Sequence, residues 1–413
     1  MLDRRQLTGL LGAAALPAPA WAASALFFYA SVGPRLTTYE LDMALAVLTP
    51  QGAVTLPANV QYAWPDPLRR FLYVVASNNK PGGLDPDAGG HFAQVFRIGG
   101  DGTLTAHGPA VPLQYRPIHA TVDPGGRFLL IAYNLPSSMT VHRIQADGSI
   151  GTQVPQAAAL DTGIYAHQIR VSPSGRTVAL VTRGNDPRSG HAEDPGALKI
   201  FAFENGQLSN LQSLAPHGQG LGFGPRHLDF GGRFAFISLE RENSICVYGL
   251  APDGRLSAEP LFIREALIDP DAKSKYPGQT AGPIHVHPNG RFVYQTNRGS
   301  GTLDYNGQQV SNGGENDIAV WRIDPATGEP TRIQNIDSHG FEIRTFSITP
   351  DGSMLIAAAQ NRLLVRDGET VKPVSAGFSF YRIGADGKLT FLRKQDIETS
   401  AGTLFWSGLL TMP

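Results

Sequence analysis

The segment Pro124-Gly125-Gly126-Arg127 separates two short apolar stretches, and this arrangement returns along the chain. Five further segments occupy the same place between apolar stretches: Pro173-Ser174-Gly175-Arg176, Pro288-Asn289-Gly290-Arg291, Pro350-Asp351-Gly352, the shorter Gly231-Gly232-Arg233 and the altered Pro67-Leu68-Arg69-Arg70. Self-similarity at a period of roughly 50 residues is typical of propellers and repeat arrays. The chain is therefore predicted to be an all-β repeat protein.

A second repeated element follows these turns, in which an aromatic residue or His usually precedes Arg-Ile and then a turn pair. Its copies are Phe96-Arg97-Ile98 with Asp101-Gly102, His142-Arg143-Ile144 with Asp147-Gly148, Tyr248 with Asp253-Gly254, Trp321-Arg322-Ile323 with Thr327-Gly328, and Tyr381-Arg382-Ile383 with Asp386-Gly387. Asp-Gly between apolar stretches favours a type I′ hairpin, in which both central residues have positive φ. Each repeat is thus predicted to be a four-stranded antiparallel sheet.

The number of repeats sets the predicted architecture. Six complete copies begin near Tyr62, Pro117, Tyr165, Pro225, Gly282 and Phe341. Residues 26–56 supply strands of a seventh copy without its inner strand, and residues 402–406 form an apolar strand without a blade. Joining both ends of the chain in one blade would remove the exposed sheet edges. We predict a seven-bladed β-propeller closed by its N-terminal and C-terminal strands, with residues 23–413 as a single domain.

Composition is consistent with one globular body. The 47 glycines and 31 prolines suit many turns, and a formal net charge of −1 gives no sign of a nucleic-acid partner. The single cysteine, Cys246, lies in an apolar run and is predicted to be a buried thiol.

Residues 1–22 combine Arg4-Arg5 with a weakly apolar segment and a small-residue cleavage site, which predicts a twin-arginine export signal. An ordinary secretory signal is the alternative; with either, we expect a periplasmic protein with no membrane association after cleavage.

Long irregular segments identify the functional rim. Residues 78–91, 184–197, 264–281 and 299–316 are either connections from a second to a third strand or a link between blades, so all four should lie at one mouth of the ring. Binding residues concentrate on loops held by a rigid scaffold. The alternative is that they are solvated surface insertions.

Polar residues are predicted to meet at this same mouth. His167 and Arg226 open inner strands, whereas Glu240 and Arg298 end second strands, and these positions share one rim. Each has a structural alternative: an ion pair between Arg226 and Glu240 within one blade, a hydrogen-bonded His167, and an Arg298 that anchors its own loop. Arginines match carboxylates and oxyanions, and histidine with a carboxylate can activate water. The four are therefore candidate catalytic residues for opening a cyclic ester.

Four further residues, and two possible metal sites, complete the candidate list. We expect substrate contacts from His119, His227, His285 and Asn297. His285 and His287 lie on one side of a strand, as zinc ligands can, but no third ligand is assignable from spacing, and structural hydrogen bonding is the commoner role. The acidic segments 85–87 and 269–271 suit turns as well as calcium. We predict neither a metal nor a cofactor.

The motifs at these positions resemble the seven-bladed propeller lactonase family, which includes bacterial 6-phosphogluconolactonase and carboxymuconate lactonizing enzyme. The resemblance rests on Gly224-Pro225-Arg226-His227, Ala166-His167, Thr296-Asn297-Arg298-Gly299 and the repeated turns, and it covers nearly all of residues 23–413. It implies catalytic roles for His167, Arg226, Glu240 and Arg298. The family usually has His-Pro before the Gly where this chain has Phe230-Gly231-Gly232, and the shorter spacing leaves Glu242 as an alternative to Glu240.

Together these features predict the activity. An export signal fits poorly with a cytoplasmic phosphorylated lactone, so we expect an exported lactonase that hydrolyses an aldonolactone such as gluconolactone to the free acid. The only expected partner is this small-molecule lactone, and the oligomeric state is left open. The alternatives are a carboxymuconate-type cycloisomerase, which would use the arginines as carboxylate clamps, and a non-catalytic binding propeller.

Overall fold

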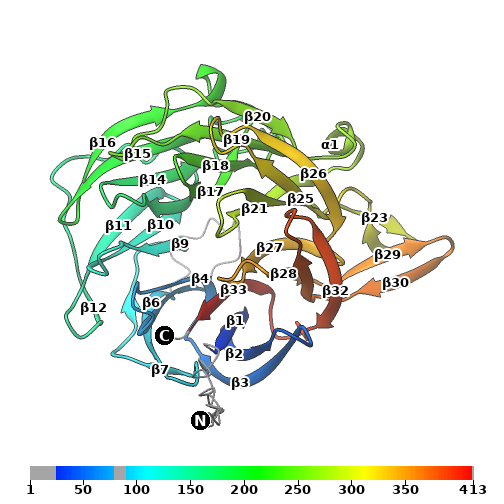
Figure 1. The fold of residues 1–413 in the computed structure, drawn as a ribbon, viewed down its shortest axis with the longest axis horizontal. Helices are drawn as coiled ribbons and strands as arrows, with labels where there is room; N and C mark the ends of the chain where they lie inside the picture. The colour runs from blue at the N-terminus through cyan, green and yellow to red at the C-terminus, as the bar shows by residue number, and fades with distance from the viewer. Residues whose placement is uncertain (1–24, 79–89, 412–413) are drawn as a thin grey trace, which may run out of the picture.

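The computed structural model describes residues 25–78 and 90–411, and in this part of the chain almost all regular structure is β-strand. Seven sheets are arranged radially around a central axis (Figure 1), and an eighth, smaller sheet lies outside this ring. Six of the seven are four-stranded, and the remaining one carries an extra short strand. The predicted export signal lies outside the described residues.

Each sheet has the four-strand order that the repeats predict. The inner strands are β4 (Asn59–Pro65), β9 (Pro117–Val122), β13 (Ala166–Val171), β17 (Pro225–Gly231), β21 (Gln279–Val286), β27 (Phe341–Ile348) and β33 (Leu404–Thr411). The second strands are β5 (Phe71–Ser77), β10 (Phe128–Asn134), β14 (Thr177–Thr182), β18 (Phe234–Leu239), β22 (Phe292–Gly299), β28 (Met354–Asn361) and β1 (Leu26–Val32). Every predicted repeat start falls within an inner strand or one residue before it.

The outer half of each sheet is more exposed. The third strands are β6 (His91–Ile98), β11 (Ser137–Ile144), β15 (Ala197–Glu204), β19 (Ser244–Gly249), β25 (Asp317–Ile323), β31 (Gly377–Ile383) and β2 (Arg35–Asp42). The outermost strands are β7 (Leu104–Ala106) with β8 (Val111–Pro112), β12 (Ile150–Gln153), β16 (Gln207–Leu214), β20 (Phe262–Glu265), β26 (Pro330–Asp337), β32 (Leu389–Asp396) and β3 (Val47–Thr55). This gradient keeps the inner strands dry and positions their side chains firmly.

The two ends of the described chain share one sheet. Strand β33 pairs with β1 in antiparallel register, from Leu26 opposite Thr411 to Val32 opposite Leu404, and lies at the inner edge of the sheet β3-β2-β1-β33. Around the axis, each inner strand contacts the next, including β27 with β33 and β33 with β4. Residues more than 370 positions apart in sequence are therefore direct neighbours.

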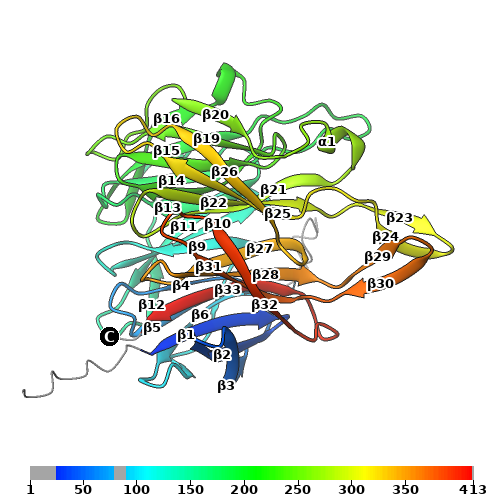
Figure 2. The same ribbon diagram turned by 45° about the vertical axis from the view of Figure 1, so that its right-hand side comes forward.

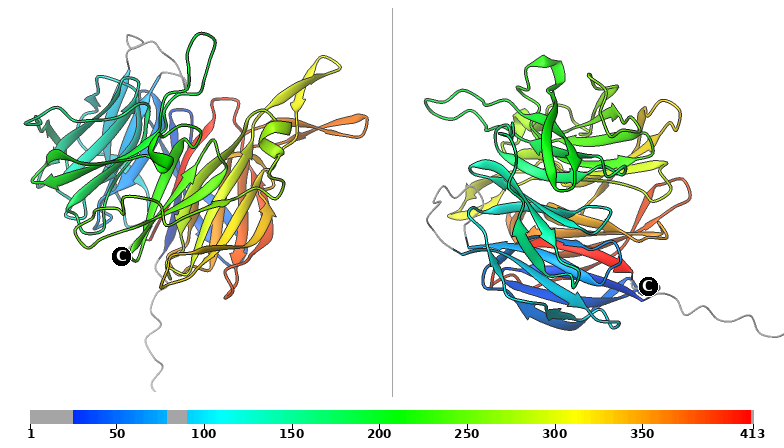
Figure 3. Two further views of the ribbon diagram at one scale, coloured as in Figure 1. Left: turned by 90° about the horizontal axis from the view of Figure 1, so that it is seen from above. Right: turned by 90° about the vertical axis from the view of Figure 1, so that its left-hand side faces the viewer.

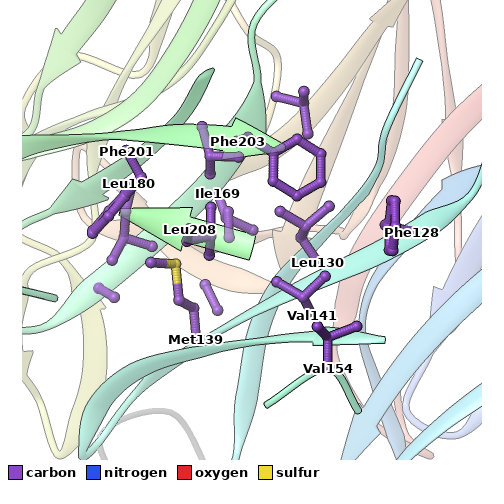
Figure 4. Close-up of a cluster of buried hydrophobic side chains, with 14 of the residues drawn as sticks. Phe128, Leu130, Met139, Val141, Val154, Ile169, Leu180, Phe201, Phe203 and Leu208 are labelled. Carbon is purple, nitrogen blue, oxygen red and sulfur yellow. The ribbon is translucent and has the colours of Figure 1, made fainter. Parts of the chain in front are cut away.

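Apolar side chains fill the space between neighbouring sheets. In the cluster of Figure 4, Phe128 and Leu130 of β10 pack with Ile169 of β13 and Phe201 of β15, all at most 3% exposed. Similar clusters lie between the other sheets. Cys246 lies in one of them, fully buried, and burial raises the pKa of its thiol well above the usual value, as expected for an inert structural cysteine.

The turn type predicted for the hairpins is wrong. Gly102 has a φ of +75°, but Asp101 is not among the residues with positive φ. Instead, Gly102 N donates to Gly99 O at 2.9 Å and Gly99 N donates to Thr103 O at 2.8 Å, the pattern of a type I turn followed by a left-handed glycine. The Asp101 carboxylate accepts the Thr103 N–H, which stabilises this turn instead of type I′.

Long connections reach out from one end of the ring. The connection from β22 to β25 contains the hairpin β23 (Thr302–Tyr305) and β24 (Gln308–Ser311), which pairs with a second hairpin, β29 (Leu363–Asp367) and β30 (Thr370–Val374). Together they project from the body (Figure 2), on one side of the ring (Figure 3). The second hairpin was not predicted from the sequence. Of the long segments predicted at this rim, residues 79–89 lie outside the described part.

Helices are short. The 3-10 helix η1 (Pro216–Gly218) and the α-helix α1 (Ala272–Lys275) both lie in connections between blades. No helix in residues 25–78 or 90–411 combines the length and apolar character needed to cross a bilayer.

Candidate active site

Each inner strand has one extra residue at an equivalent position. The pairing with the second strand shifts there by one residue, which places a β-bulge in all seven sheets. The bulges fall at Gln61, Ile118, His167, Arg226, Gly282-Pro283, Arg344 and Phe405. A bulge bends its strand and redirects a side chain, and bulges are common beside active sites.

Four of these bulge residues line a cavity at the starts of the inner strands. It has a volume of about 270 Å³ and contains more arginines than carboxylates. The lining residues are Arg116, Ile118, Tyr165, His167, Arg183, Asp186, Arg226, Glu240 and Arg344. The structure therefore brings three of the four predicted catalytic residues into one cavity.

Glu240 joins these residues to the fourth, Arg298. Arg298 Nη2 donates to Glu240 Oε1 at 2.5 Å, and Arg183 Nε donates to the other oxygen, Oε2. Burial alone would raise the pKa of Glu240, but Arg183, Arg298 and Arg226 outweigh burial and hold it well below its usual value. Glu240 is therefore an ionised anchor for arginines. Of the two glutamates that the sequence offered for this role, Glu240 and Glu242, Glu240 is the one that lines the cavity.

Arg226 is the least satisfied group in this cavity. Its side chain is 1% exposed, and its Nε lies 3.2 Å from Glu240 Oε1. Although that is an ion-pair distance, none of the three guanidinium nitrogens has an aligned hydrogen-bond partner among the described residues. The ion pair therefore satisfies Arg226 only in part, because a hydrogen bond weakens steeply when it is misaligned. A buried guanidinium whose N–H groups lack acceptors can donate hydrogen bonds to an anionic or carbonyl oxygen of a ligand.

Three buried imidazoles continue from the cavity along the axis that the seven inner strands surround, which is called the central channel below. The rings of His167 and His227 lie 5.2 Å apart, and those of His227 and His119 lie 6.3 Å apart. Burial holds the pKa of all three well below the usual value, with further lowering from nearby arginines, so they are neutral at pH 7. His167 Nδ1 has no hydrogen-bond partner in the described structure. The hydrogen-bonded structural role that was the alternative for His167 therefore lacks a contact at this atom.

The other predicted substrate contacts lie elsewhere. His285 is at the opposite end of the channel, with its Nδ1 3.5 Å from Asp229 Oδ2. His287 Nε2 donates to Gly352 O at 2.9 Å, the structural role that was weighed against metal binding. Within residues 25–78 and 90–411, no three His, Cys, Asp or Glu side chains are arranged to hold a metal ion.

Asn297 faces into its own blade instead of the cavity. Its Nδ2 donates to Asp317 Oδ1 at 2.8 Å and to Ala266 O at 3.0 Å. Asn335 Nδ2 donates to the second oxygen of Asp317 at 2.8 Å. Asn297 thus supports a buried carboxyl, and nothing in this geometry places it near a substrate.

This buried carboxyl makes stability depend on pH. Burial raises the pKa of Asp317 from 3.8 to about 7 in the folded state. Between about pH 4 and 7 the folded form holds a proton that the unfolded form has lost, so the free energy of unfolding falls as pH rises, by at most about 1.4 kcal/mol per unit. We expect Asp317→Asn to flatten this decline in urea titrations at several pH values. An unchanged slope, equal to that of the surface variant Asp253→Asn, would contradict the assignment.

Sequence reasoning missed three arginines of the cavity. Arg183 directly follows second strand β14, and Arg298 lies next to the last residue of second strand β22, so a comparable signal was present in Thr182-Arg183-Gly184. Arg344 occupies a bulge, and Arg116 directly precedes β9. Burial lowers the pKa of Arg344 to about 9 and that of Arg116 to about 10, which leaves both charged at pH 7.

Comparison with known proteins identifies the family. The family model described as "Lactonase, 7-bladed beta-propeller" matches residues 29–371. The chain belongs to this family. Among curated proteins, a 6-phosphogluconolactonase of Yersinia pestis (strain Pestoides F) is 27% identical over 339 residues, which cover 73% of this chain and 90% of that protein. The chain is therefore an enzyme of the lactonase family.

Solved structures share the lactonase-family fold. The Pseudomonas aeruginosa periplasmic gluconolactonase PpgL aligns with a TM-score of 0.70 at 21% identity, covering 94% of this chain and 100% of that chain. A protein from Lactobacillus plantarum aligns with a TM-score of 0.67 at 20% identity, covering 94% and 100%. At these identities the likeness concerns the fold alone.

Proposed function

We propose that the protein hydrolyses the lactone of a sugar acid, such as gluconolactone, at the cavity around Glu240. The observation that carries this proposal is Arg226, a fully buried guanidinium whose N–H groups lack aligned partners in the described residues. The lactone carbonyl oxygen would accept from Arg226 and would be stabilised most when it becomes the oxyanion of the tetrahedral intermediate. Family membership and the names of the relatives support the same activity.

The other residues then take distinct roles. His167, neutral and next to Arg226, accepts a proton as water adds to the lactone carbonyl carbon, and returns it to the ring oxygen as the carbon–oxygen bond breaks. The products are the hydroxyl and carboxyl groups of the open acid. Glu240 remains ionised and keeps Arg183 and Arg298 in place, so it is a positioning residue.

The test measures lactone opening directly. Purified protein is mixed with gluconolactone at pH 6.5, and acid release is followed with a pH indicator against the spontaneous rate. We expect saturable acceleration by wild type, and loss of most of it in His167→Gln. A rate equal to the spontaneous rate for gluconolactone and for a panel of related sugar lactones would refute the proposed function.

A second candidate function follows from the surplus of arginines. Arg116 and Arg344 face the cavity, and no carboxylate among the described residues pairs with either. Arg116 Nη2 donates to the Gln61 amide oxygen, and the Arg344 guanidinium lies 3.8 Å from the Phe405 ring centroid. These free charges favour a substrate with its own carboxylate or phosphate. Closure of an unsaturated diacid would use the same arginines, and decay of muconate ultraviolet absorbance tests for it.

The same surplus predicts selectivity among lactones. We expect Arg344→Gln to raise KM for a lactone that carries an additional carboxylate by roughly tenfold. KM for neutral gluconolactone should change less than twofold, because that substrate has no anion for Arg344. Steady-state kinetics with both lactones make the comparison. Equal changes in both KM values would mean that Arg344 supports the cavity without recognising charge.

We further propose that the protein is exported and that its termini close the ring. Residues 1–22 carry the twin-arginine pattern, and the structural neighbour from Pseudomonas aeruginosa is described as periplasmic. Pairing of β33 with β1 supports closure. Replacing Arg4 and Arg5 by Lys should retain the protein in the cytoplasm, as measured by cell fractionation. Export unaffected by these changes but blocked by loss of the apolar segment would favour an ordinary secretory signal.

A further inference from the structure

A second cavity lies at the other end of the central channel. It has a volume of about 280 Å³, and its wall comes largely from the second halves of inner strands β4, β21, β27 and β33. The arginine-lined cavity instead uses the starts of inner strands. His227 lines this second cavity and His167 the first, so the row of channel histidines separates the two.

Aromatic rings dominate the wall of the second cavity. Tyr62, Trp64, Phe346 and Trp406 all line it. The rings of Tyr62 and Trp64 are nearly parallel, with centroids 6.5 Å apart, and Tyr62 meets Trp406 edge to face at 6.2 Å. Small-molecule sites typically combine such apolar walls with a few fixed polar groups. Aromatic faces of this kind stack on flat rings or on the C–H faces of sugars.

The second cavity has no free charge to offer. Its described lining contains no Asp, Glu, Lys or Arg. Arg170 does not line the cavity, but its guanidinium lies 5.0 Å from the ring centroid of the wall residue Trp64. Its Nη2 pairs with Asp229 Oδ1 at 3.0 Å, so the two charges cancel. His227 is neutral, because burial lowers its pKa well below the usual value. An ion entering this cavity would lose water without gaining a counter-charge, and neutral ligands are therefore favoured.

Polar groups at the cavity are few and held in place. Asp229 Oδ2 accepts the Val286 N–H at 3.0 Å and lies 3.5 Å from His285 Nδ1, which orients the imidazole. The His285 side chain is 31% exposed, so it is open to a ligand. Hydroxyl groups of Thr345 and Ser407, 2.8 Å apart, also line the wall. Such groups exchange hydrogen bonds with hydroxyl groups of a ligand.

We propose that this cavity is a second binding site, which takes a neutral monosaccharide ring. The aromatic walls stack on the C–H face of the sugar, and His285, His227 and the two hydroxyls bind its hydroxyl groups. The protein would then have two binding cavities of different chemistry on one axis, one lined by arginines and one lined by aromatic side chains. This site is separate from the proposed hydrolysis, and its occupation requires no turnover.

The experiment uses the full chain and methyl β-D-glucopyranoside, a neutral hexose ring with no lactone to hydrolyse. Calorimetric titration should give saturable binding, and tryptophan fluorescence should change, because two of the four tryptophans line the cavity. His285→Ala and Trp64→Ala should each weaken binding by roughly tenfold. Arg226→Met, at the other end of the channel, should leave the affinity unchanged, and circular dichroism confirms folding of each variant.

Several outcomes would overturn the second site. They are an absence of saturable binding, affinity unaffected by His285→Ala in a folded variant, or loss of binding in Arg226→Met, which would place the sugar among the arginines. Binding of phenol without binding of the glucoside would reject the sugar and assign the cavity to aromatic ligands. Because no lactone is present, failure here leaves the proposed hydrolysis untouched, and failure of hydrolysis leaves this binding measurable.

Discussion

Replacement of Arg226 by Met is expected to lower kcat for lactone hydrolysis by about 10²–10³-fold, the loss typical when one oxyanion donor is removed. The folded protein should be at least as stable as wild type. The reason is that Arg226 is buried with no aligned hydrogen bonds in the described residues. The free energy lost by removing its guanidinium from water is therefore not fully offset in the folded state. Glu240 keeps Arg183 and Arg298 as partners in the variant. Kinetics and thermal unfolding on one preparation measure both effects.

A variant that loses kcat without losing stability would show that Arg226 acts in catalysis and is not needed for the fold. A structural ion pair with Glu240, the alternative that the sequence left open, predicts that Arg226→Met lowers the unfolding temperature. Arg241→Met is the matched control. Arg241 lies near the same rim but pairs with Asp186 and Glu193 and does not line the cavity. The kcat of the Arg241→Met variant should fall by a few-fold at most. An equal fall in kcat for Arg226→Met and Arg241→Met would indicate a general charge effect.

The repeats in the sequence predicted most of the architecture. The number of blades followed from the six repeated turns, such as Pro124-Gly125-Gly126-Arg127, and from the isolated apolar strand at 402–406. Each turn marks one copy, because it lies between the first two strands of its repeat. The hairpin turn type was wrong at Asp101-Gly102, since the Asp side chain stabilises a type I turn locally. The hairpin at 363–374 carries the same kind of signal, with Asp367-Gly368 after Leu363-Leu364-Val365, but it lies between the second and third strands of a repeat, where the repeat pattern predicts only a connection.

The candidate site was predictable in outline but not in detail. Strand ends share a rim in any propeller, and that rule alone brought His167, Arg226 and Glu240 together. Side chains alternate between the two faces of a regular strand, but every inner strand carries a bulge that breaks this alternation. The sequence pattern therefore does not predict which side chain enters the channel. The bulges do not explain Asn297, which follows the regular register of second strand β22 and donates to Asp317 instead of facing the cavity.

Deletion of residues 402–413 is expected to abolish cooperative folding of the whole protein. Strand β33 supplies the inner strand of its sheet, pairing with β1 over seven positions, and it also contacts β27 and β4. Trp406 and Leu410 lie in the cluster that packs this sheet against the next. Without them, two inner strands face water and β1 becomes an exposed edge. Near-ultraviolet circular dichroism and thermal unfolding measure the loss.

A circular permutant separates closure of the ring from simple loss of residues. Leu26 lies opposite Thr411 in the antiparallel pair, so a two-residue Asn-Gly turn should join them as a hairpin. A chain that runs through residues 402–411, this turn and then residues 26–401 contains the same strands in a new order. We expect it to fold and to hydrolyse lactones at a rate close to wild type. If the truncated chain folds and remains active, the strand at the C-terminal end does not close the propeller; if the permutant alone is unfolded, the order of the strands matters as well as their presence.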